Sequence, residues 1–179
     1  MKKTPFIFLL NMLFLGLLLQ PHLSFAQDKN NPALKSILLD QYKSTYNVEE
    51  WFVPATKAVE GMTAEQATWK GCDSCHSVAQ EVTHLIYWNK EALARFRGEK
   101  PDPFGGDNSK TFVNVDKAQW TAIVAQLDQV LGDIQRFIEQ TDEAKLKQWY
   151  SGISHVSTHN AYHTGQILFI RKMQGSWKR

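Results

Sequence analysis

Two histidines lie one helical turn apart near the C-terminus. His159 and His163 are four positions apart in the segment 156–170, whose apolar residues recur at helical spacing. The periodicity places both imidazoles on the apolar face, where unpaired ring donors and acceptors would be costly to bury. Because side chains at i and i+4 can contact one ion, the spacing favours a metal site, and a hydrogen-bonded core histidine is the alternative for each residue. His155, at the edge of the stripe, is expected beside the site or on the surface.

A second set of reactive residues is Cys72-Asp-Ser-Cys75-His76. This run matches the C-x-x-C-H pattern of covalent c-type haem attachment, in which His76 would be the axial ligand. Four other interpretations are open: a short disulfide, a redox pair, two reduced cysteines at the start of a helix, or a zinc site. The pattern alone assigns no catalytic role to either cysteine.

The elements that must position these residues are helices. Asn31-Pro32 is a good helix start, and apolar residues follow at helical spacing over about residues 32–61, where Pro54 should kink or interrupt the helix. Residues 63–66, Thr-Ala-Glu-Gln, match a capping box that opens a short helical turn.

Three further amphipathic segments follow. Asp73 or Ser74 can cap the second helix and Asp116 the third, and the fourth helix is expected after a break near Thr141 and a turn around Trp149. Proline and glycine make residues 98–115 a long loop that lies over one end of the fold. Four amphipathic helices predict an all-α, antiparallel four-helix bundle, with metal sites on facing helices in its core. The three later helices are expected over about residues 74–97, 116–141 and 152–173.

The first 26 residues have the composition of a secretory signal peptide. Lys2 and Lys3 precede the apolar stretch 6–19, and the small residues Ser24 and Ala26 suit cleavage after Ala26. We therefore expect export to the bacterial periplasm and a single domain over residues 27–179, with an uncleaved anchor as the alternative. The formal charge of +2 belongs to the leader, so the balanced remainder favours neither nucleic-acid binding nor stable membrane association after cleavage.

A third metal ligand would have to come from the second helix, where His84 is the candidate. It lies about 120° from the centre of that helix's apolar stripe, so periodicity alone predicts a partly exposed histidine. However, two segments together resemble the DinB-like (YfiT-like) superfamily of metal-binding four-helix bundles, over essentially the whole chain after the leader. These segments are His155-Val-Ser-Thr-His159-Asn-Ala-Tyr162-His163-Thr-Gly165-Gln166-Ile167 and Ser77-x-x-x-Glu81-x-x-His84-Leu85.

The resemblance implies a ligand set. One histidine of the second helix and two of the last hold a divalent cation in that family, which corresponds here to His84, His159 and His163. Imidazole ligation suits zinc, nickel, iron or copper. Three further residues are candidates to contact the ligands or a bound water, with ordinary bundle polarity as the alternative. They are Glu81, Tyr162 and Gln166.

Three neutral histidines leave coordination positions open, as in catalytic zinc sites. We expect a metal-dependent hydrolase that uses a metal-activated water on a small-molecule substrate. The family resemblance also implies a thiol S-transferase as an alternative, although low-molecular-weight thiols are cytosolic and an exported protein has poor access to them. A non-catalytic metal-binding bundle and a monohaem cytochrome are further alternatives, and a homodimer through helix faces is compatible with a bundle of this size.

Overall fold

A computed structural model describes residues 33–101 and 103–177 of the chain. All regular elements in this part of the chain are helices, and none of them is both long and apolar enough to cross a membrane. The signal peptide expected over residues 1–26 lies outside the described residues. The helices are α2 (Ala33–Tyr46), α3 (Ala55–Val59), α4 (Ala64–Thr68), α5 (Val78–Arg97), η2 (Asn108–Thr111), η3 (Lys117–Gln119), α6 (Trp120–Gln140) and α7 (Glu143–Met173).

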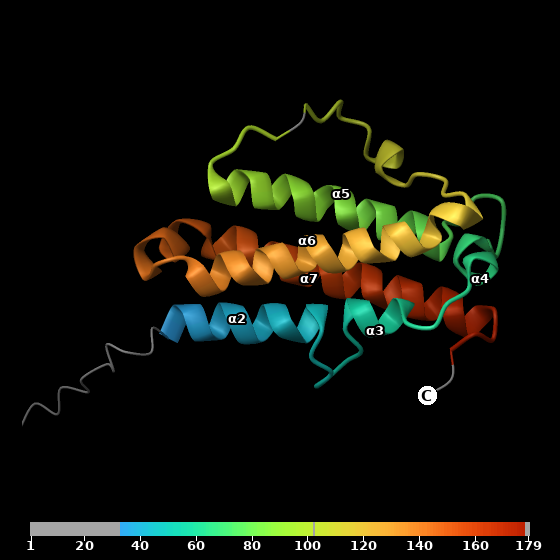
Figure 1. Cartoon of the computed structure of the whole chain (residues 1–179), viewed down its shortest axis with the longest axis horizontal. Helices are drawn as coiled ribbons and strands as arrows, with labels where there is room; N and C mark the ends of the chain where they lie inside the picture. The colour runs from blue at the N-terminus through green and yellow to red at the C-terminus, as the bar shows by residue number, and fades with distance from the viewer. Residues whose placement is uncertain (1–32, 102, 178–179) are drawn as a thin grey trace, which may run out of the picture. The chain divides into compact units, whose positions relative to one another are not determined.

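Four of these helices form the expected bundle. Helix α2 packs against α6 and α7, and α5 packs against the same two helices. Figure 1 shows that α2 and α7 run in one direction and α5 and α6 in the other. The parallel direction of α5 and α6 requires the long 98–119 connection to cross the length of the bundle, and this crossing brings the loop over α5. The prediction of an all-α four-helix bundle with a long second connection is confirmed. The expected antiparallel packing holds for the α5–α7 and α2–α6 pairs, whereas the α2–α7 and α5–α6 pairs are parallel.

The first expected helix is broken earlier than we predicted. A single helix over 32–61 is wrong, because α2 ends at Tyr46 and the chain is irregular until α3 begins after Pro54, which precedes its first helical residue. Thr56 Oγ1 donates to the carbonyl oxygen of Tyr46 at 2.9 Å and ties the two pieces together. The interruption at Pro54 and the capping box between Thr63 and Gln66 are confirmed.

Helix α5 begins later than its sequence pattern predicted. Ser77, rather than Asp73 or Ser74, is the N-cap residue, and Ser77 and Gln80 form a capping box. The reason is the preceding turn: Cys72 and Cys75 form a disulfide, and the Cys75 backbone N–H donates to the Cys72 carbonyl at 3.1 Å. The Ser77–Gln80 capping box begins α5 two residues after this turn.

The last helix is longer than predicted. A start near Gly152 after a turn around Trp149 is wrong, because Asp142 accepts a hydrogen bond from the Lys145 backbone N–H at 2.8 Å and α7 runs unbroken from Glu143. Gly152 has a packing role instead. A Cβ atom there would lie 3.0 Å from Cε1 of Phe96, so the glycine allows α7 to approach α5 closely.

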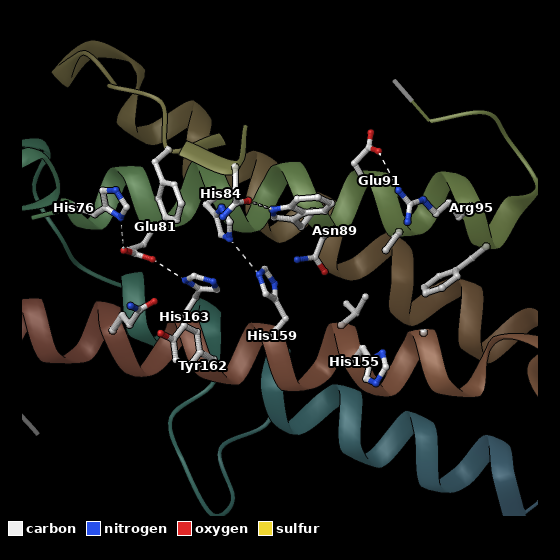
Figure 2. A pocket seen from close by; sticks show the side chains of 18 of the residues that line it. His76, Glu81, His84, Asn89, Glu91, Arg95, His155, His159, Tyr162 and His163 are labelled. Atoms are coloured by element: carbon white, nitrogen blue, oxygen red, sulfur yellow. Dashed lines mark hydrogen bonds and ion pairs between the residues drawn. The ribbon is translucent and has the colours of Figure 1, made fainter. Parts of the chain in front are cut away.

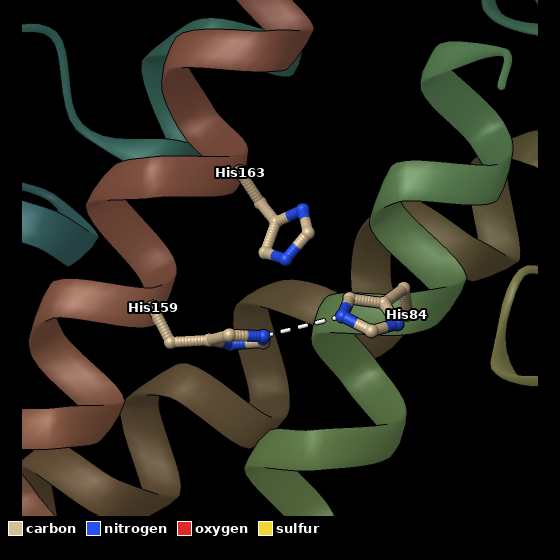
Figure 3. Close-up of side chains that lie close together, drawn as sticks. All are labelled: His84, His159 and His163. Atoms are coloured by element: carbon tan, nitrogen blue, oxygen red, sulfur yellow. Dashed lines mark hydrogen bonds between the residues drawn. The ribbon is translucent and has the colours of Figure 1, made fainter. Parts of the chain in front are cut away.

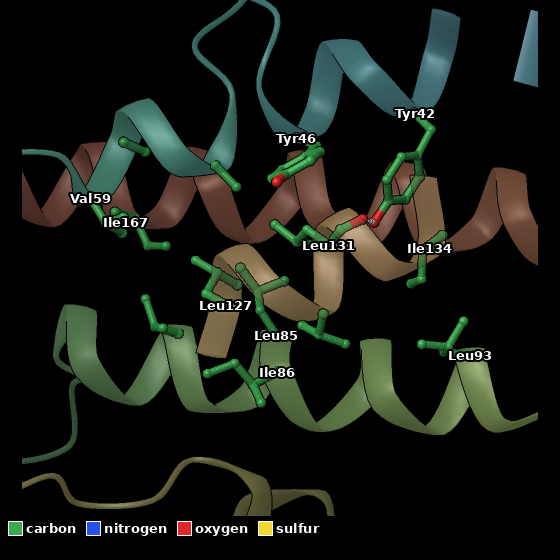
Figure 4. Close-up of a cluster of buried hydrophobic side chains, with 14 of the residues drawn as sticks. Tyr42, Tyr46, Val59, Leu85, Ile86, Leu93, Leu127, Leu131, Ile134 and Ile167 are labelled. Atoms are coloured by element: carbon green, nitrogen blue, oxygen red, sulfur yellow. Dashed lines mark hydrogen bonds between the residues drawn. The ribbon is translucent and has the colours of Figure 1, made fainter. Parts of the chain in front are cut away.

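The core lies between the four helices, where the apolar stripes of α5 and α6 meet α2 and α7 (Figure 4). Tyr42 is fully buried and donates to the Leu131 carbonyl at 3.0 Å, which joins α2 to α6. Asn89 and Asn160 exchange side-chain hydrogen bonds of 2.7 and 3.3 Å between α5 and α7, so that these buried amides are satisfied. The bundle thereby fixes the register of the two helices that carry the histidines. The residues of the apolar stripe of α5 are all buried: Val78, Val82, Leu85, Leu93 and Phe96.

Candidate metal centre

Three histidines meet at the seam between α5 and α7 (Figure 3). One ring nitrogen from each of His84, His159 and His163 lies within 4.8 Å of the other two. The Nε2 atoms of His84 and His159 are 3.2 Å apart. Two nitrogens bound to one zinc ion in tetrahedral geometry are about 3.4 Å apart, so small side-chain rotations would bring all three nitrogens into one coordination sphere.

Glu81 fixes the orientation of His163. Its Oε2 lies 2.7 Å from His163 Nδ1, and its Oε1 lies 3.3 Å from Nδ1 of His76 (Figure 2). The carboxylate is 2% exposed and His163 is 6% exposed. When Nδ1–H of His163 donates to the carboxylate, Nε2 carries the lone pair that faces the other two histidines. This carboxylate–histidine arrangement is the one that orients imidazole ligands in metal proteins.

Thr111 has the corresponding role for His84. The Thr111 hydroxyl donates to the Asn108 carbonyl at 2.7 Å, so its oxygen accepts from Nδ1–H of His84 at 2.5 Å. A hydroxyl has a single proton to donate, and this assignment leaves Nε2 of His84 unprotonated. Two of the three imidazoles are therefore held in the tautomer that metal binding requires.

The loop that carries Thr111 is attached to α5 by its own hydrogen bonds. Thr83 Oγ1 lies 3.2 Å from the Thr111 carbonyl and accepts from the Val113 backbone N–H at 3.0 Å. Gln80 Nε2 donates to the Phe112 carbonyl at 3.3 Å and to Asn114 Oδ1 at 3.2 Å. Residues 111–114 are thus fastened along the helix, although nothing in their local sequence pattern indicates contact with a histidine.

Phe112 covers the seam and explains why His84 is buried. Its ring stacks on His84 with centroids 4.1 Å apart and on His76 with centroids 3.8 Å apart. The exposure expected for His84 from periodicity is therefore wrong: the side chain is 2% exposed. Sequence reasoning missed both Phe112 and Thr111, because a long irregular loop has no periodicity from which a facing residue can be inferred.

Burial sets the protonation of the cluster. Desolvation, then the neighbouring imidazoles His163, His159 and His76, lower the pKa of His84 to about 3. Desolvation and His163 lower the pKa of His159 to about 4, against the opposing effect of Glu81. Both rings are neutral at pH 7. Because a metal ligand must present an unprotonated nitrogen, the donor set fits a divalent transition-metal ion.

The cluster lies in a cavity of about 780 Å³ between α5 and α7 (Figure 2). This volume lies in the range of small-molecule sites and far exceeds what one ion needs. Trp88, Phe96 and Trp149 contribute apolar walls, while Asn108 and Phe112 of the loop border the histidine end. The long connection was expected over one end of the fold; it runs along α5 instead (Figure 1), and Asn108 and Phe112 are the residues through which it borders the site.

The remaining predicted residues lie at different depths. Tyr162 is 64% exposed and contacts His163 edge-on, with ring centroids 5.0 Å apart. Gln166 lines the cavity, and its Oε1 accepts no hydrogen bond from the described residues. His155 is exposed and lines the cavity one helical turn before His159. Glu81 is therefore the one of the three expected outer residues that hydrogen-bonds a histidine of the cluster.

The cysteine pair is separate from the cavity. Both sulfurs form the disulfide, and the turn that contains them is exposed. Haem attachment would need both thiols for thioether bonds, and both sulfurs are used in the disulfide. His76 lines the edge of the histidine cavity, where it contacts Glu81 and Phe112. Of the interpretations left open by the sequence, the structure contains the disulfide.

The described part of the chain is thus an all-helical bundle in which three histidines from its second and last long helices converge in one cavity. The sequence matches the model of the DinB superfamily over residues 55–167, which include all three histidines. The chain belongs to this superfamily. No curated protein and no solved structure matched the sequence. Membership and the three-histidine cluster are together compatible with metal binding.

Proposed function

We propose that this protein is an exported metal-dependent hydrolase in which His84, His159 and His163 hold a divalent zinc, nickel, iron or copper ion. The observation that carries the proposal is the convergence of three ring nitrogens within 4.8 Å at one end of a cavity large enough for a substrate. Three protein ligands are typical of catalytic sites, because a structural zinc site is usually closed by four.

The residues of the chain have separable tasks in this proposal. The bound ion would supply Lewis acidity, which lowers the pKa of a water molecule or polarises a substrate carbonyl. Glu81 and Thr111 orient the imidazoles of His163 and His84 before the ion arrives, so little rearrangement opposes binding. The apolar walls around Trp88 and Phe112 shield the histidine end from bulk water, which strengthens electrostatic interactions there.

Export is supported by two independent features. The N-terminal sequence has the charged, apolar and small-residue regions of a signal peptide. The exposed disulfide between Cys72 and Cys75 belongs in an oxidising compartment, since cytosolic thiols are kept reduced. Protein recovered from the periplasmic fraction should begin at Gln27, and recovery of the full chain from the cytosol would contradict export.

Metal analysis and an activity screen test the proposal together. Wild-type protein isolated from the periplasm should contain about one equivalent of transition metal, and His159→Ala should lose it because one of only three ligands is removed. His155→Ala is the matched control for metal content, since this exposed histidine lies on the same helix outside the cluster. Turnover of an ester or amide by the wild type and its loss in His159→Ala would support hydrolysis, whereas bound metal without turnover in a broad screen would favour a non-catalytic binder.

A further inference from the structure

The cavity extends well beyond the histidine cluster. On α5, His84, Trp88, Glu91 and Arg95 follow one another at helical spacing along one face, and all four line the cavity. His84 and Arg95 are therefore separated by about 16 Å along the helix axis. Figure 2 shows the histidines toward one end of this row and Arg95 toward the other, with His155 on the facing helix.

The two ends of the cavity differ in chemistry. The histidine end offers neutral nitrogens for a cation, and the middle is apolar, with Trp88, Ala92 and Val156 as walls. Phe96 and Trp149, with ring centroids 5.4 Å apart, line the cavity near the far end. An apolar substrate body suits this middle section, because a polar body would lose its hydration against the walls of Trp88, Ala92 and Val156.

Arg95 supplies a positive charge at the far end. Its side chain is 54% exposed, and its guanidinium is 3.8 Å from Glu91 Oε2, too far for a hydrogen bond. Glu91 is 6% exposed, and its Oε2 accepts no hydrogen bond from the described residues, so its ion pair with Arg95 leaves the guanidinium donors available to a ligand. His155 on α7 also lines the cavity and offers a second nitrogen donor. Planar guanidinium donors suit a carboxylate, which can accept two parallel hydrogen bonds.

We infer that the substrate has an apolar body ending in a carboxylate, which Arg95 and His155 bind at the end of the cavity remote from the histidines. This inference rests on the proposed function, because it assumes that the reacting bond lies at the histidine cluster. The side chain of Arg95 leans back toward the N-terminus of α5, as helical side chains do, which sets the distance from the cluster to the guanidinium at roughly 10 Å.

Two hydroxamate probes can test this without requiring turnover. Both have a zinc-binding hydroxamate and an alkyl chain of about 10 Å, the length set by the helical spacing above; one chain ends in a carboxylate and the other in a methyl group. Calorimetry with the zinc-loaded protein should show the carboxylate probe binding about tenfold more tightly, the value expected for a partly exposed charge-assisted hydrogen bond. Arg95→Ala should reduce this ratio to about one.

Arg97→Ala is the matched control, because Arg97 is two residues away on the same helix and lines a different hollow from the histidine cavity. It should keep the tenfold ratio. Arg95→Gln provides a second variant that preserves most of the apolar stem, and it should lose the ratio in the same way. His155→Ala should reduce the ratio to a smaller extent.

The outcomes distinguish the two proposals. Equal binding of both probes to the wild type, or an unchanged ratio in Arg95→Ala, would overturn the carboxylate subsite while leaving metal binding intact. Failure of both probes to bind the zinc-loaded wild type would overturn the proposed function and this inference with it. A tenfold ratio that Arg95→Ala abolishes and Arg97→Ala retains would support both.

Discussion

Replacing Glu81 with glutamine should weaken zinc binding about tenfold. The carboxylate is 2% exposed, and its Oε2 lies 2.7 Å from His163 Nδ1. Loss of such outer partners lowers metal affinity by about 10- to 100-fold. Glutamine keeps an acceptor oxygen for Nδ1–H and loses only the negative charge. We therefore expect the smaller, tenfold loss of zinc affinity, which corresponds to about 1.4 kcal/mol of binding free energy. Glu81→Ala removes the acceptor as well and should approach the upper end.

The assay is a competition titration of the metal-free protein with zinc and a chromophoric chelator at pH 7.5. Glu91→Gln is a matched control, because Glu91 is also a buried glutamate on α5 and lines the same cavity without contacting the three histidines. Its zinc affinity should equal that of the wild type. Far-UV circular dichroism and thermal melting of each variant establish that the bundle is intact before the affinities are compared.

Two outcomes would contradict the roles assigned to these side chains. If Glu81→Gln and Glu81→Ala both bind zinc like the wild type while His163→Ala binds it weakly, His163 is a ligand that needs no carboxylate to orient it. If His163→Ala also binds zinc normally, the three-histidine site itself is wrong. The expected order of affinities is wild type and Glu91→Gln, then Glu81→Gln, then Glu81→Ala.

Two further predictions concern stability. The folded-state pKa values of His84 and His159, about 3 and about 4, lie below the ordinary value of 6.5, so the unfolded chain binds more protons as the pH falls below 6.5. Urea unfolding of the metal-free protein should show a constant free energy of unfolding above that pH and a decrease toward pH 4, with a slope of up to about 2.7 kcal/mol per pH unit. The double variant His84→Gln/His159→Gln should show a smaller slope, and an equal slope would contradict the assignment of the pH dependence to these two histidines. Replacing Cys72 and Cys75 by serine should lower the free energy of unfolding by about 2 kcal/mol, because the short disulfide loop restricts the unfolded chain; equal urea midpoints for variant and oxidised wild type would show that the bond contributes nothing.

Much of the fold follows from local patterns. The apolar stripes of α5 and α6 identify helices and their inner faces, since a period near 3.6 residues reflects the geometry of one helix alone. The ends of helices were harder to predict. Asp142 caps α7 where the sequence suggested a separate turn around Trp149, and the disulfide turn delays the start of α5 to Ser77. Several capping residues stand close together in these regions, and only packing decides which one is used.

The candidate site was also only partly predictable from the sequence. The four-residue spacing of His159 and His163 places them on adjacent turns of any helix, so their proximity is a property of the sequence. The inclusion of His84 depends on how α5 crosses α7, and periodicity alone had placed this histidine at an exposed flank. Family resemblance indicated it, and the structure brings its Nε2 to 3.2 Å from that of His159.

Local sequence patterns were therefore sufficient to predict the amphipathic helices and the imidazole pair on one turn, because both depend on neighbours within a few residues. In contrast, the contacts of Thr111 and Phe112 with His84 and the extension of the cavity to Arg95 could be seen only once the helices were packed. These contacts join residues far apart in the chain through a loop without regular structure. Their geometry is set by helix packing and by the path of the crossing connection, neither of which leaves a local pattern in the sequence.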